Sequence, residues 1–308
     1  MACTCPGRTC GSGAAPEVTL HGEIPMVRRS RRGMTLLEVL CAVAVAAVVL
    51  GLFLPAVQKV REASARLQCA HHLRQIALSF HHYHDAQGYF PLGGTHLPPR
   101  FPTTADFTAV TPAARLRSWN WAYAILPFLE QSTLYEHPNS RVVKGTAVAI
   151  YYCPTRRKPQ LYEGYARIDY AGNAGDHPLG LNGLVVRTGH GVVRFADIFD
   201  GSSHTVLIGE KQLNRAMLGY TADDNEPYPI TGWNEDWDVY RWGAEPPAPD
   251  YSAPGRLEGS RVFGSAHANG FYAAFADGSV RFLRYTIPPG IWRRACVRND
   301  MQVVPLNE

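Results

Sequence analysis

Apolar residues dominate one segment near the start of the chain. From Met34 to Leu54 the only charged residue is Glu38, and as an α-helix this segment would span about 31 Å, the thickness of a bilayer core. Four arginines precede it, at positions 28, 29, 31 and 32, and a basic flank of this kind stays on the cytoplasmic side. The pattern therefore predicts a transmembrane helix over 34–54, with the bulk of the chain outside the cytoplasm.

The helical pattern continues beyond Pro55 and becomes one-sided. Gly88 and Pro91 predict its end. A cleavable secretory signal is the competing interpretation of 34–54, but the small residues typical of a cleavage site lie inside the apolar run and not after it. We therefore expect one long helix with a transmembrane half at 34–54 and an amphipathic half at 55–88. The apolar positions of the second half recur at steps of three and four: Val57, Val60, Ala63, Leu67, Ala70, Leu73, Ile76, Ala77, Phe80 and Tyr83.

Strand and turn signals replace the helical pattern after residue 91. The best strand candidates are 183–187, 204–210 and 262–284. Within the last of these, Asp277-Gly278 predicts a two-residue hairpin turn with positive φ. An antiparallel sheet with long loops, packed on the second half of the long helix, gives an α+β fold with a β-rich extracytoplasmic domain over 89–300 and a tail over 301–308.

Composition supports a folded domain and excludes some functions. Charged residues make up 18 % of the 308 residues and hydrophobic residues 46 %, which is enough to bury a core. Residues 1–33 hold five Arg and two Glu, so most of the net charge of +4 lies there and the remainder offers no nucleic-acid-binding face. Residues 1–25 predict no regular structure, and translation starting at Met26 would leave the short basic leader MVRRSRRG.

The sequence offers no evident catalytic site. It contains no P-loop, G-x-G-x-x-G, H-E-x-x-H or C-x-x-C motif. His267 and Asp277 are ten residues apart and would meet only if the chain folded back near Gly270. No Ser or Cys nucleophile is paired with a base, so we expect a protein that is not an enzyme.

The segment around Gly33 resembles the processing site of type IV prepilins and type II secretion pseudopilins. A basic leader, Gly, Thr-Leu-Leu-Glu, an apolar run and Pro follow in that order, although Met stands where Phe is commoner. The resemblance implies cleavage after Gly33 by a prepilin peptidase and N-methylation of Met34. It also assigns Thr35, Glu38 and Pro55 to assembly, with Glu38 paired to the N-terminal amine of a neighbouring subunit. The alternative is an ordinary anchor in which Glu38 lies at headgroup level.

The same resemblance implies partners and a location. The partners are the prepilin peptidase, an assembly platform with its ATPase, and further copies of this chain. The precursor would lie in the inner membrane with its N-terminus cytoplasmic, and the processed chain would enter a periplasmic or surface filament. The alternative function is a membrane-anchored module that binds a glycan or solute and never polymerises.

The outer domain resembles a narrower group. It is similar to a large bacterial group of pilin-like proteins whose domain has no defined function and is sometimes given a solute-binding label. That group ends in a His-x(9)-Asp-Gly motif, which His267, Asp277 and Gly278 match, with a structural role expected for all three. The resemblance covers about 28–300, and its further stretches are SWNWAYAILPFLEQSTLYE at 118–136, YYCPTRR at 151–157, IDYAGNAG at 168–175 and DIFDGSSHTVLIGEK at 197–211.

The loop 223–245 mixes tryptophans with carboxylates. Carboxylates and loop carbonyls can hold calcium, exposed aromatic rings can stack on a sugar, and equally the tryptophans can simply pin the loop to the sheet. Related pseudopilins bind calcium in a C-terminal loop, so calcium is a possible cofactor, although the spacing fits no EF-hand. The candidate ligands are Asp223, Asp224, Asp236 and Asp238, interleaved with Trp233, Trp237 and Trp242.

Two other groups of residues raise the question of a ligand or a crosslink. His81, His84 and Asp85 share a helix face and could hold a metal, but a helix C-terminus favours histidine without one. Outside the cytoplasm one disulfide could form among Cys69, Cys153 and Cys296. We expect Cys69–Cys153, since Cys69 lies beside the apolar stripe and Cys153 follows a short strand-like stretch.

Overall fold

The computed structural model describes residues 33–95, 111–177, 179–229 and 237–303. By its internal contacts the chain divides into two compact units, Met1–Leu54 and Pro55–Glu308. Each unit is described by itself, and the boundary between them falls within the long N-terminal helix, at Pro55.

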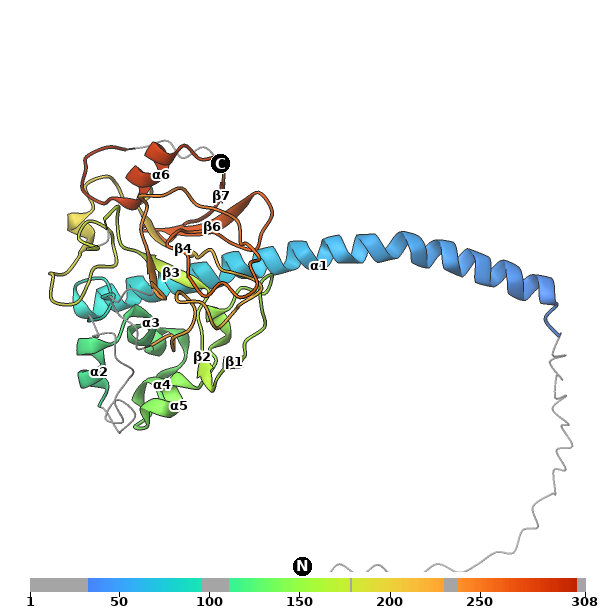
Figure 1. The fold of residues 1–308 in the computed structure, drawn as a ribbon, viewed down its shortest axis with the longest axis horizontal. Helices are drawn as coiled ribbons and strands as arrows, with labels where there is room; N and C mark the ends of the chain where they lie inside the picture. The colour runs from blue at the N-terminus through green and yellow to red at the C-terminus, as the bar shows by residue number, and fades with distance from the viewer. Residues whose placement is uncertain (1–32, 96–110, 178, 230–236, 304–308) are drawn as a thin grey trace, which may run out of the picture. The chain divides into compact units, whose positions relative to one another are not determined.

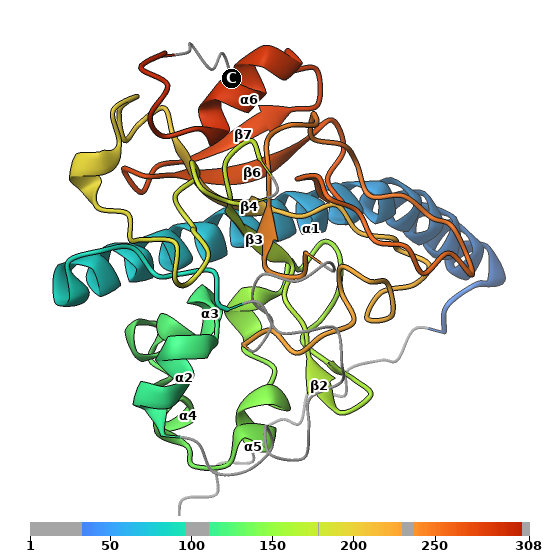
Figure 2. The same ribbon diagram turned by 60° about the vertical axis from the view of Figure 1, so that its left-hand side comes forward.

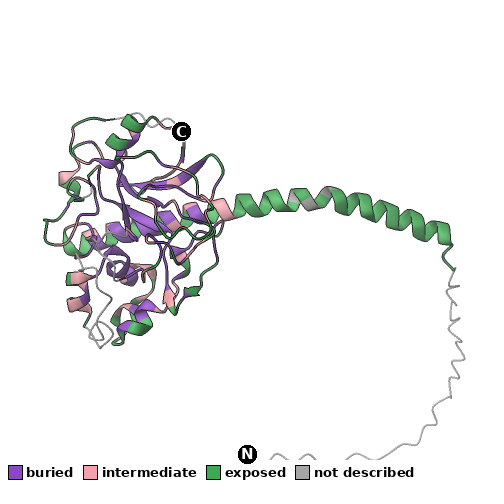
Figure 3. Ribbon diagram, viewed as in Figure 1, coloured by how far each residue is buried: buried purple, intermediate pink, exposed green. Residues whose placement is uncertain are grey.

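Helix α1 runs from Leu36 to Gln87 (Figure 1). Thr35 and Glu38 exchange hydrogen bonds across its first turn, and Gly88 ends it with a φ of 81°. In the first unit every described side chain of the helix is exposed (Figure 3). No helix in the described part of the chain is long and apolar enough to cross a membrane. The membrane insertion expected for 34–54 gains no support from this finding and stays a prediction from the sequence.

In the second unit one face of α1 is buried, beginning at Cys69. Val57, Val60 and Leu67 belong to the predicted stripe but are exposed, because the stripe meets packing partners only from Cys69 onward. Phe80 then packs on Trp121, with ring centroids 5.4 Å apart. The buried residues of this face are Cys69, Leu73, Ile76, Ala77, Phe80 and Tyr83.

A five-stranded sheet forms the centre of the second unit, in the order β5-β3-β4-β6-β7. All its pairings are antiparallel except that of β3 with β5, so the predicted α+β fold with a mostly antiparallel sheet is confirmed. The strands are β3 (Tyr170–Asn173), β4 (Val206–Glu210), β5 (Tyr240–Arg241), β6 (Gly270–Phe275) and β7 (Val280–Arg284), and a separate hairpin joins β1 (Leu161–Tyr162) to β2 (Tyr165–Ala166).

Helices cover both faces of this sheet, and β6 shows how the sequence arranges this. Phe271, Ala273 and Phe275 point to one face, where α6 (Pro289–Cys296) packs and the rings of Phe271 and Trp292 lie 5.4 Å apart. The alternate residues Tyr272 and Ala274 belong to the core that includes α1. The period-two pattern of this strand therefore contributes to two cores. Figure 2 shows α1 and α6 on opposite sides of the sheet.

Short helices pack on the α1 side of the molecule, away from α6 (Figure 2). Asn120 caps one of them by accepting a hydrogen bond from Ala122 N at 2.8 Å. The elements are α2 (Pro112–Ser118), α3 (Trp121–Ala124), η2 (Leu126–Leu129), α4 (Ser132–Glu136), α5 (Ser140–Lys144) and η3 (Ala149–Tyr151), and η4 (Phe195–Asp197) follows later in the chain.

Two of the three predicted strand regions are found, and one is wrong. Residues 204–210 contain β4, and 262–284 contain the β6–β7 hairpin. Residues 183–186 are buried and Arg187 is half-buried, but the segment forms no strand, and Val185 packs closely on β3. A Cβ placed on Gly172 of β3 would lie 2.5 Å from a methyl group of Val185.

The turn between β6 and β7 is also longer than predicted. Positive φ falls at Gly278 alone, at 81°, and the loop comprises residues 276–278, closed by a hydrogen bond from Phe275 N to Ser279 O at 2.8 Å. Asp277 accepts a hydrogen bond from Ser279 N at 2.8 Å. This is the three-residue hairpin with one left-handed glycine and not the two-residue turn.

We predict that Gly278→Ala lowers the free energy of unfolding by about 2 kcal/mol. An L-residue in this conformation costs about 1–2 kcal/mol, and the new Cβ would lie 3.2 Å from His81 Cε1. The matched control is Gly164→Ala, at φ 83° with no atom within 4 Å of the new Cβ. Chemical denaturation should show a smaller loss of unfolding free energy for the control. Equal losses would mean that the contact with His81 does not contribute.

Candidate functional site

The first turn of α1 holds the residues that the sequence associates with processing and assembly. Gly33 and Met34 are exposed at the start of the described chain. Thr35 N donates to Glu38 Oε2 at 3.0 Å and Glu38 N donates to Thr35 Oγ1 at 3.3 Å, which is a capping box. Glu38 therefore has a partner within its own chain. Sequence reasoning missed this local role, although Thr-x-x-Glu is its signature.

The helix that follows this cap exposes apolar surface along the first unit. Such a surface needs lipid or another protein to cover it. The large exposed side chains are Leu36, Leu37, Val39, Leu40, Val43, Val45, Val48, Val49, Leu50 and Phe53.

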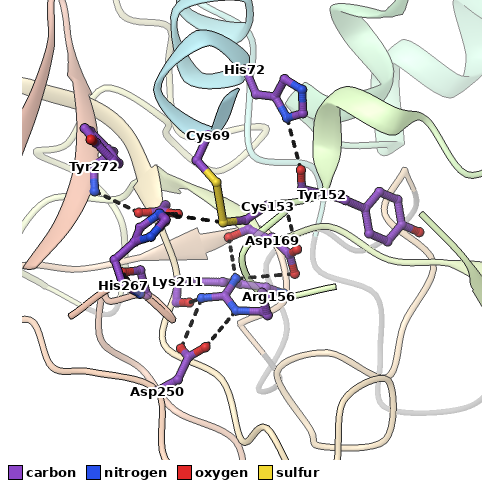
Figure 4. Close-up of a disulfide and its surroundings, with 12 residues drawn as sticks. Cys69, His72, Tyr152, Cys153, Arg156, Asp169, Lys211, Asp250, His267 and Tyr272 are labelled. Atoms are coloured by element: carbon purple, nitrogen blue, oxygen red, sulfur yellow. Dashed lines mark hydrogen bonds and ion pairs between the residues drawn. A yellow bond between two sulfur atoms is a disulfide. The ribbon is translucent and has the colours of Figure 1, made fainter. Parts of the chain in front are cut away.

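A disulfide ties α1 to the globular part of the second unit (Figure 4). It joins Cys69, on the buried face of α1, to Cys153, which follows η3; their Cα atoms are 5.2 Å apart. This is the pair expected from the sequence. Next to it, His72 Nδ1 lies 3.0 Å from the carbonyl oxygen of Tyr152. Of the remaining described cysteines, Cys41 is exposed and Cys296 is buried, and neither is bonded.

A histidine and a carboxylate lie beside the disulfide. His267 Nε2 is 3.7 Å from Cys153 Sγ and 3.2 Å from Glu210 Oε1. Both side chains are completely buried. The other oxygen of Glu210 accepts a hydrogen bond from Tyr272 N at 2.8 Å. The sequence singled out His267 but not Glu210, whose only signal is a charge at the end of the apolar strand VLIGE.

Buried ion pairs continue from this cluster. Arg156 lies 2.8 Å from Asp250 and 3.4 Å from Asp169, and Arg157 lies 2.7 Å from Asp169 and 2.6 Å from Asp224. Asp169 also accepts a hydrogen bond from Cys153 N at 2.8 Å. Charges removed from water need this kind of mutual compensation, so the network fixes how the segments that carry it must meet.

The predicted calcium ligands belong to the same network. Asp223 pairs with Arg241 at 3.0 Å, and Asp224 pairs with Arg157. The arginine side chains therefore already neutralise these two carboxylates, and a calcium ion would have to compete with them. Asp236 and Trp233 lie outside the described residues. The calcium site remains a prediction without supporting geometry.

The tryptophans of this loop that are described contact the rest of the domain. Trp242 is buried, and the ring of Trp237 lies 5.6 Å from that of Trp242. The Arg261 guanidinium lies 4.2 Å from the centroid of Trp237. These contacts favour the interpretation in which the tryptophans hold the loop in place.

The pKa values of two candidate calcium ligands, Asp224 and Asp238, are shifted in opposite directions. Burial alone would raise the pKa of Asp224, but the charges of Arg157 and Lys211 outweigh it and hold that pKa below its usual value. Burial, reinforced by the charge of Glu226, raises the pKa of Asp238 well above its usual value. One Asp238 carboxylate oxygen has no hydrogen-bond partner within the described structure.

The two ends of the His-x(9)-Asp-Gly motif do different things. His267 lies at the disulfide, whereas Asp277 and Gly278 form the β6–β7 turn. His81 on α1 supports that turn, with Nε2 2.8 Å from the carbonyl oxygen of Ala276. His84 contacts the ring of Phe195 at 4.6 Å, so these two histidines of the helix face serve packing.

The fold and the N-terminal segment together define a class of protein. In this class a long helix, with exposed apolar side chains in its first part, continues into an α+β domain. Comparison with known families places the chain within that class. Residues 58–290 match the family described as a protein of unknown function, DUF1559, and residues 28–54 match the prokaryotic N-terminal methylation motif. The chain belongs to this DUF1559 family and is pilin-like. Neither description names an enzyme. No curated protein and no solved structure matches it.

We predict that replacing both Cys69 and Cys153 by Ser lowers the free energy of unfolding by about 3–4 kcal/mol, since the crosslink closes a long loop. Their sequence separation is 84 residues. Reductant should destabilise the unsubstituted protein by a similar amount and leave the double variant unchanged. Thiol counting in denaturant checks the pairing: Cys69 and Cys153 reacting without reductant would refute it.

We also predict opposite effects from two matched substitutions. The raised pKa of Asp238 means that the folded state binds more protons than the unfolded one above about pH 4, so this group lowers stability as pH rises toward its folded pKa. Asp238→Asn should therefore become more stable relative to the unsubstituted protein as pH rises from 4 to 8, by at least about 1 kcal/mol.

Asp224→Asn should do the reverse. The depressed pKa of Asp224 contributes stability above its unfolded pKa, which is lost as pH falls through the folded value. The variant should lose about 3–5 kcal/mol at neutral pH, because Arg157 loses a buried partner. Denaturant unfolding at several pH values measures both variants, and parallel pH profiles for the two would contradict the assignment.

Proposed function

We propose that this protein is a pilin subunit that is cut after Gly33, N-methylated at Met34, and assembled through α1 into a filament or pseudopilus. The match of residues 28–54 to the N-terminal methylation motif carries this proposal. The exposed apolar side chains of the first unit support it, because packing against other subunits would cover them. The processing enzyme would be a prepilin peptidase, and assembly would require a platform and an ATPase.

Glu38 has two successive roles in this proposal. In the single chain it caps α1 through Thr35. In a filament its charge would pair with the amine of Met34 in the neighbouring subunit, where the surroundings are apolar and an uncompensated charge is costly. The two roles are separable, since glutamine also completes a capping box but carries no charge.

We predict that Glu38→Gln is processed normally but is absent from the sheared surface fraction. Glu38→Ala should also be absent from that fraction. In addition, the first turn of its helix should be less stable, because the cap is lost. The control is Glu62→Gln, a carboxylate of the same helix whose partner, Arg66 at 2.7 Å, lies one turn away; it should assemble.

Mass spectrometry of the N-terminal peptide in the membrane and sheared fractions gives the readout. An N-methylated peptide beginning at Met34 supports processing, and its presence in the sheared fraction supports a filament. Normal assembly of Glu38→Gln would overturn the charge-pairing role while leaving the cap. An unprocessed chain confined to the membrane would overturn the proposed function.

A second candidate is a membrane-anchored binding module that does not polymerise. One observation favours it: a cleft of about 620 Å³ is lined by side chains that include Trp237, Tyr251, Arg256, Glu258 and Arg261. Aromatic rings next to charged groups suit a sugar or a polar solute. Arg261 already covers one face of Trp237, which leaves less of that ring for stacking. The same fractionation separates the two candidates.

A further inference from the structure

Four metal-ligating side chains meet at the disulfide. They come from four separate parts of the second unit: Cys69 from α1, Cys153 after η3, Glu210 from the end of β4, and His267 ahead of β6. Figure 4 labels the two cysteines and His267. One ligand atom from each lies within 4.8 Å of all the others, and all four residues are buried. In the part of the chain that the structure describes, this is the one such group.

A disulfide by itself does not require the other two side chains. Burying a carboxylate and an imidazole is expensive unless they find partners. Glu210 Oε1 and His267 Nε2 face each other at 3.2 Å, but Oε1 accepts no well-formed hydrogen bond, and His267 Nδ1 has no hydrogen bond to any described residue. The position of His267 Nε2, between a sulfur and a carboxylate oxygen, therefore calls for an explanation other than the crosslink.

We propose that Cys69, Cys153, Glu210 and His267 bind a divalent zinc-type ion when the two cysteines are reduced. Two S–H bonds break, two protons leave to water and two metal–sulfur bonds form, with no change of oxidation state. His267 Nε2 and the Glu210 carboxylate supply the third and fourth ligands. Thiolate, imidazole and carboxylate in a closed set of four is the composition of a structural zinc site.

The distances fit this assignment. Ligands at 2.0–2.3 Å from a tetrahedral ion lie roughly 3.3–3.8 Å from one another. His267 Nε2 is already 3.7 Å from Cys153 Sγ and 3.2 Å from Glu210 Oε1. The main movement needed is the separation of the two sulfurs. The ion and three anionic ligands carry one net negative charge, and Arg156 is near enough for its charge to act on Glu210.

Neighbouring groups hold two of the ligands from behind. Tyr272 N donates to Glu210 Oε2, and Cys153 N donates to Asp169, both at 2.8 Å. Such supporting hydrogen bonds orient ligands around an ion. Neither hydrogen bond involves a sulfur atom, so reduction of the disulfide breaks neither of them directly.

Ion and disulfide are then alternative states of one cluster. The newly made chain carries thiols and can take up the ion. A disulfide-bearing oxidant that accepts two electrons by thiol–disulfide exchange would form the Cys69–Cys153 bond and release the ion. The proposal stands whether or not the protein polymerises.

Cobalt(II) titration of the full-length chain tests this site. Cys3, Cys5, Cys10 and Cys41 are replaced by Ser so that they cannot bind the probe, and a phosphine reductant keeps the remaining thiols reduced. We expect one cobalt per chain, with thiolate-to-cobalt charge-transfer bands and the visible bands of a tetrahedral site, displaced by zinc. The same protein with its disulfide intact should show no such bands.

Substitutions identify the ligands. His267→Gln and Glu210→Gln should each weaken cobalt binding by at least about tenfold, the size of effect seen even for groups that only support ligands. Cys296→Ser, which alters a cysteine outside the cluster, should leave binding unchanged. Near-ultraviolet circular dichroism of each variant reports whether the fold is retained.

Three results would overturn the proposal. The first is a reduced, folded protein without cobalt–thiolate bands. The second is a set of bands that survives Cys69→Ser with Cys153→Ser, or that neither His267→Gln nor Glu210→Gln weakens. The third is a reduced protein that unfolds and is not restored by cobalt or zinc.

Discussion

The second unit depends on the burial of one carboxylate, Asp169. It is fully buried, and it pairs with Arg156 and Arg157 while accepting a hydrogen bond from Cys153 N. Its backbone carbonyl accepts a hydrogen bond from Lys211 N, just beyond β4. Because buried charges of one sign must be matched by the other, these segments can meet in few ways other than the observed one. The disulfide then joins α1 to these segments, because Cys69 is bonded to Cys153.

The two units of the chain are therefore stabilised in different ways. The second unit is crosslinked and compensated internally, with cores on both faces of its sheet. The described helix of the first unit has its cap at Thr35 and Glu38 and an apolar surface that no described residue of the chain covers. Assembly of the first unit with lipid or with other copies is consistent with this division, since an exposed apolar surface is stabilised only by a partner.

The structure also changes how the family motif is understood. Its histidine contacts the crosslink and its Asp-Gly closes a hairpin against His81. One short motif thus lies at two points where α1 meets the domain, one at the Cys69–Cys153 disulfide and one at His81. A single sequence pattern can join separate roles in this way because strand β6 carries the chain from one site to the other.

The sequence by itself determined the long helix, the mostly antiparallel sheet and the N-terminal motif, because periodicity, turn residues and a local cleavage signal are properties of short stretches. It also indicated Cys69 and Cys153. It misassigned 183–187 and the length of the turn at Asp277, since Val185 packs closely on β3 and only the register of β6 and β7 sets the loop. The tertiary structure alone decided that Glu210 meets His267, and that Asp223 and Asp224 pair with arginines. Those contacts join residues far apart in the chain, and no local pattern encodes which buried charge will compensate which.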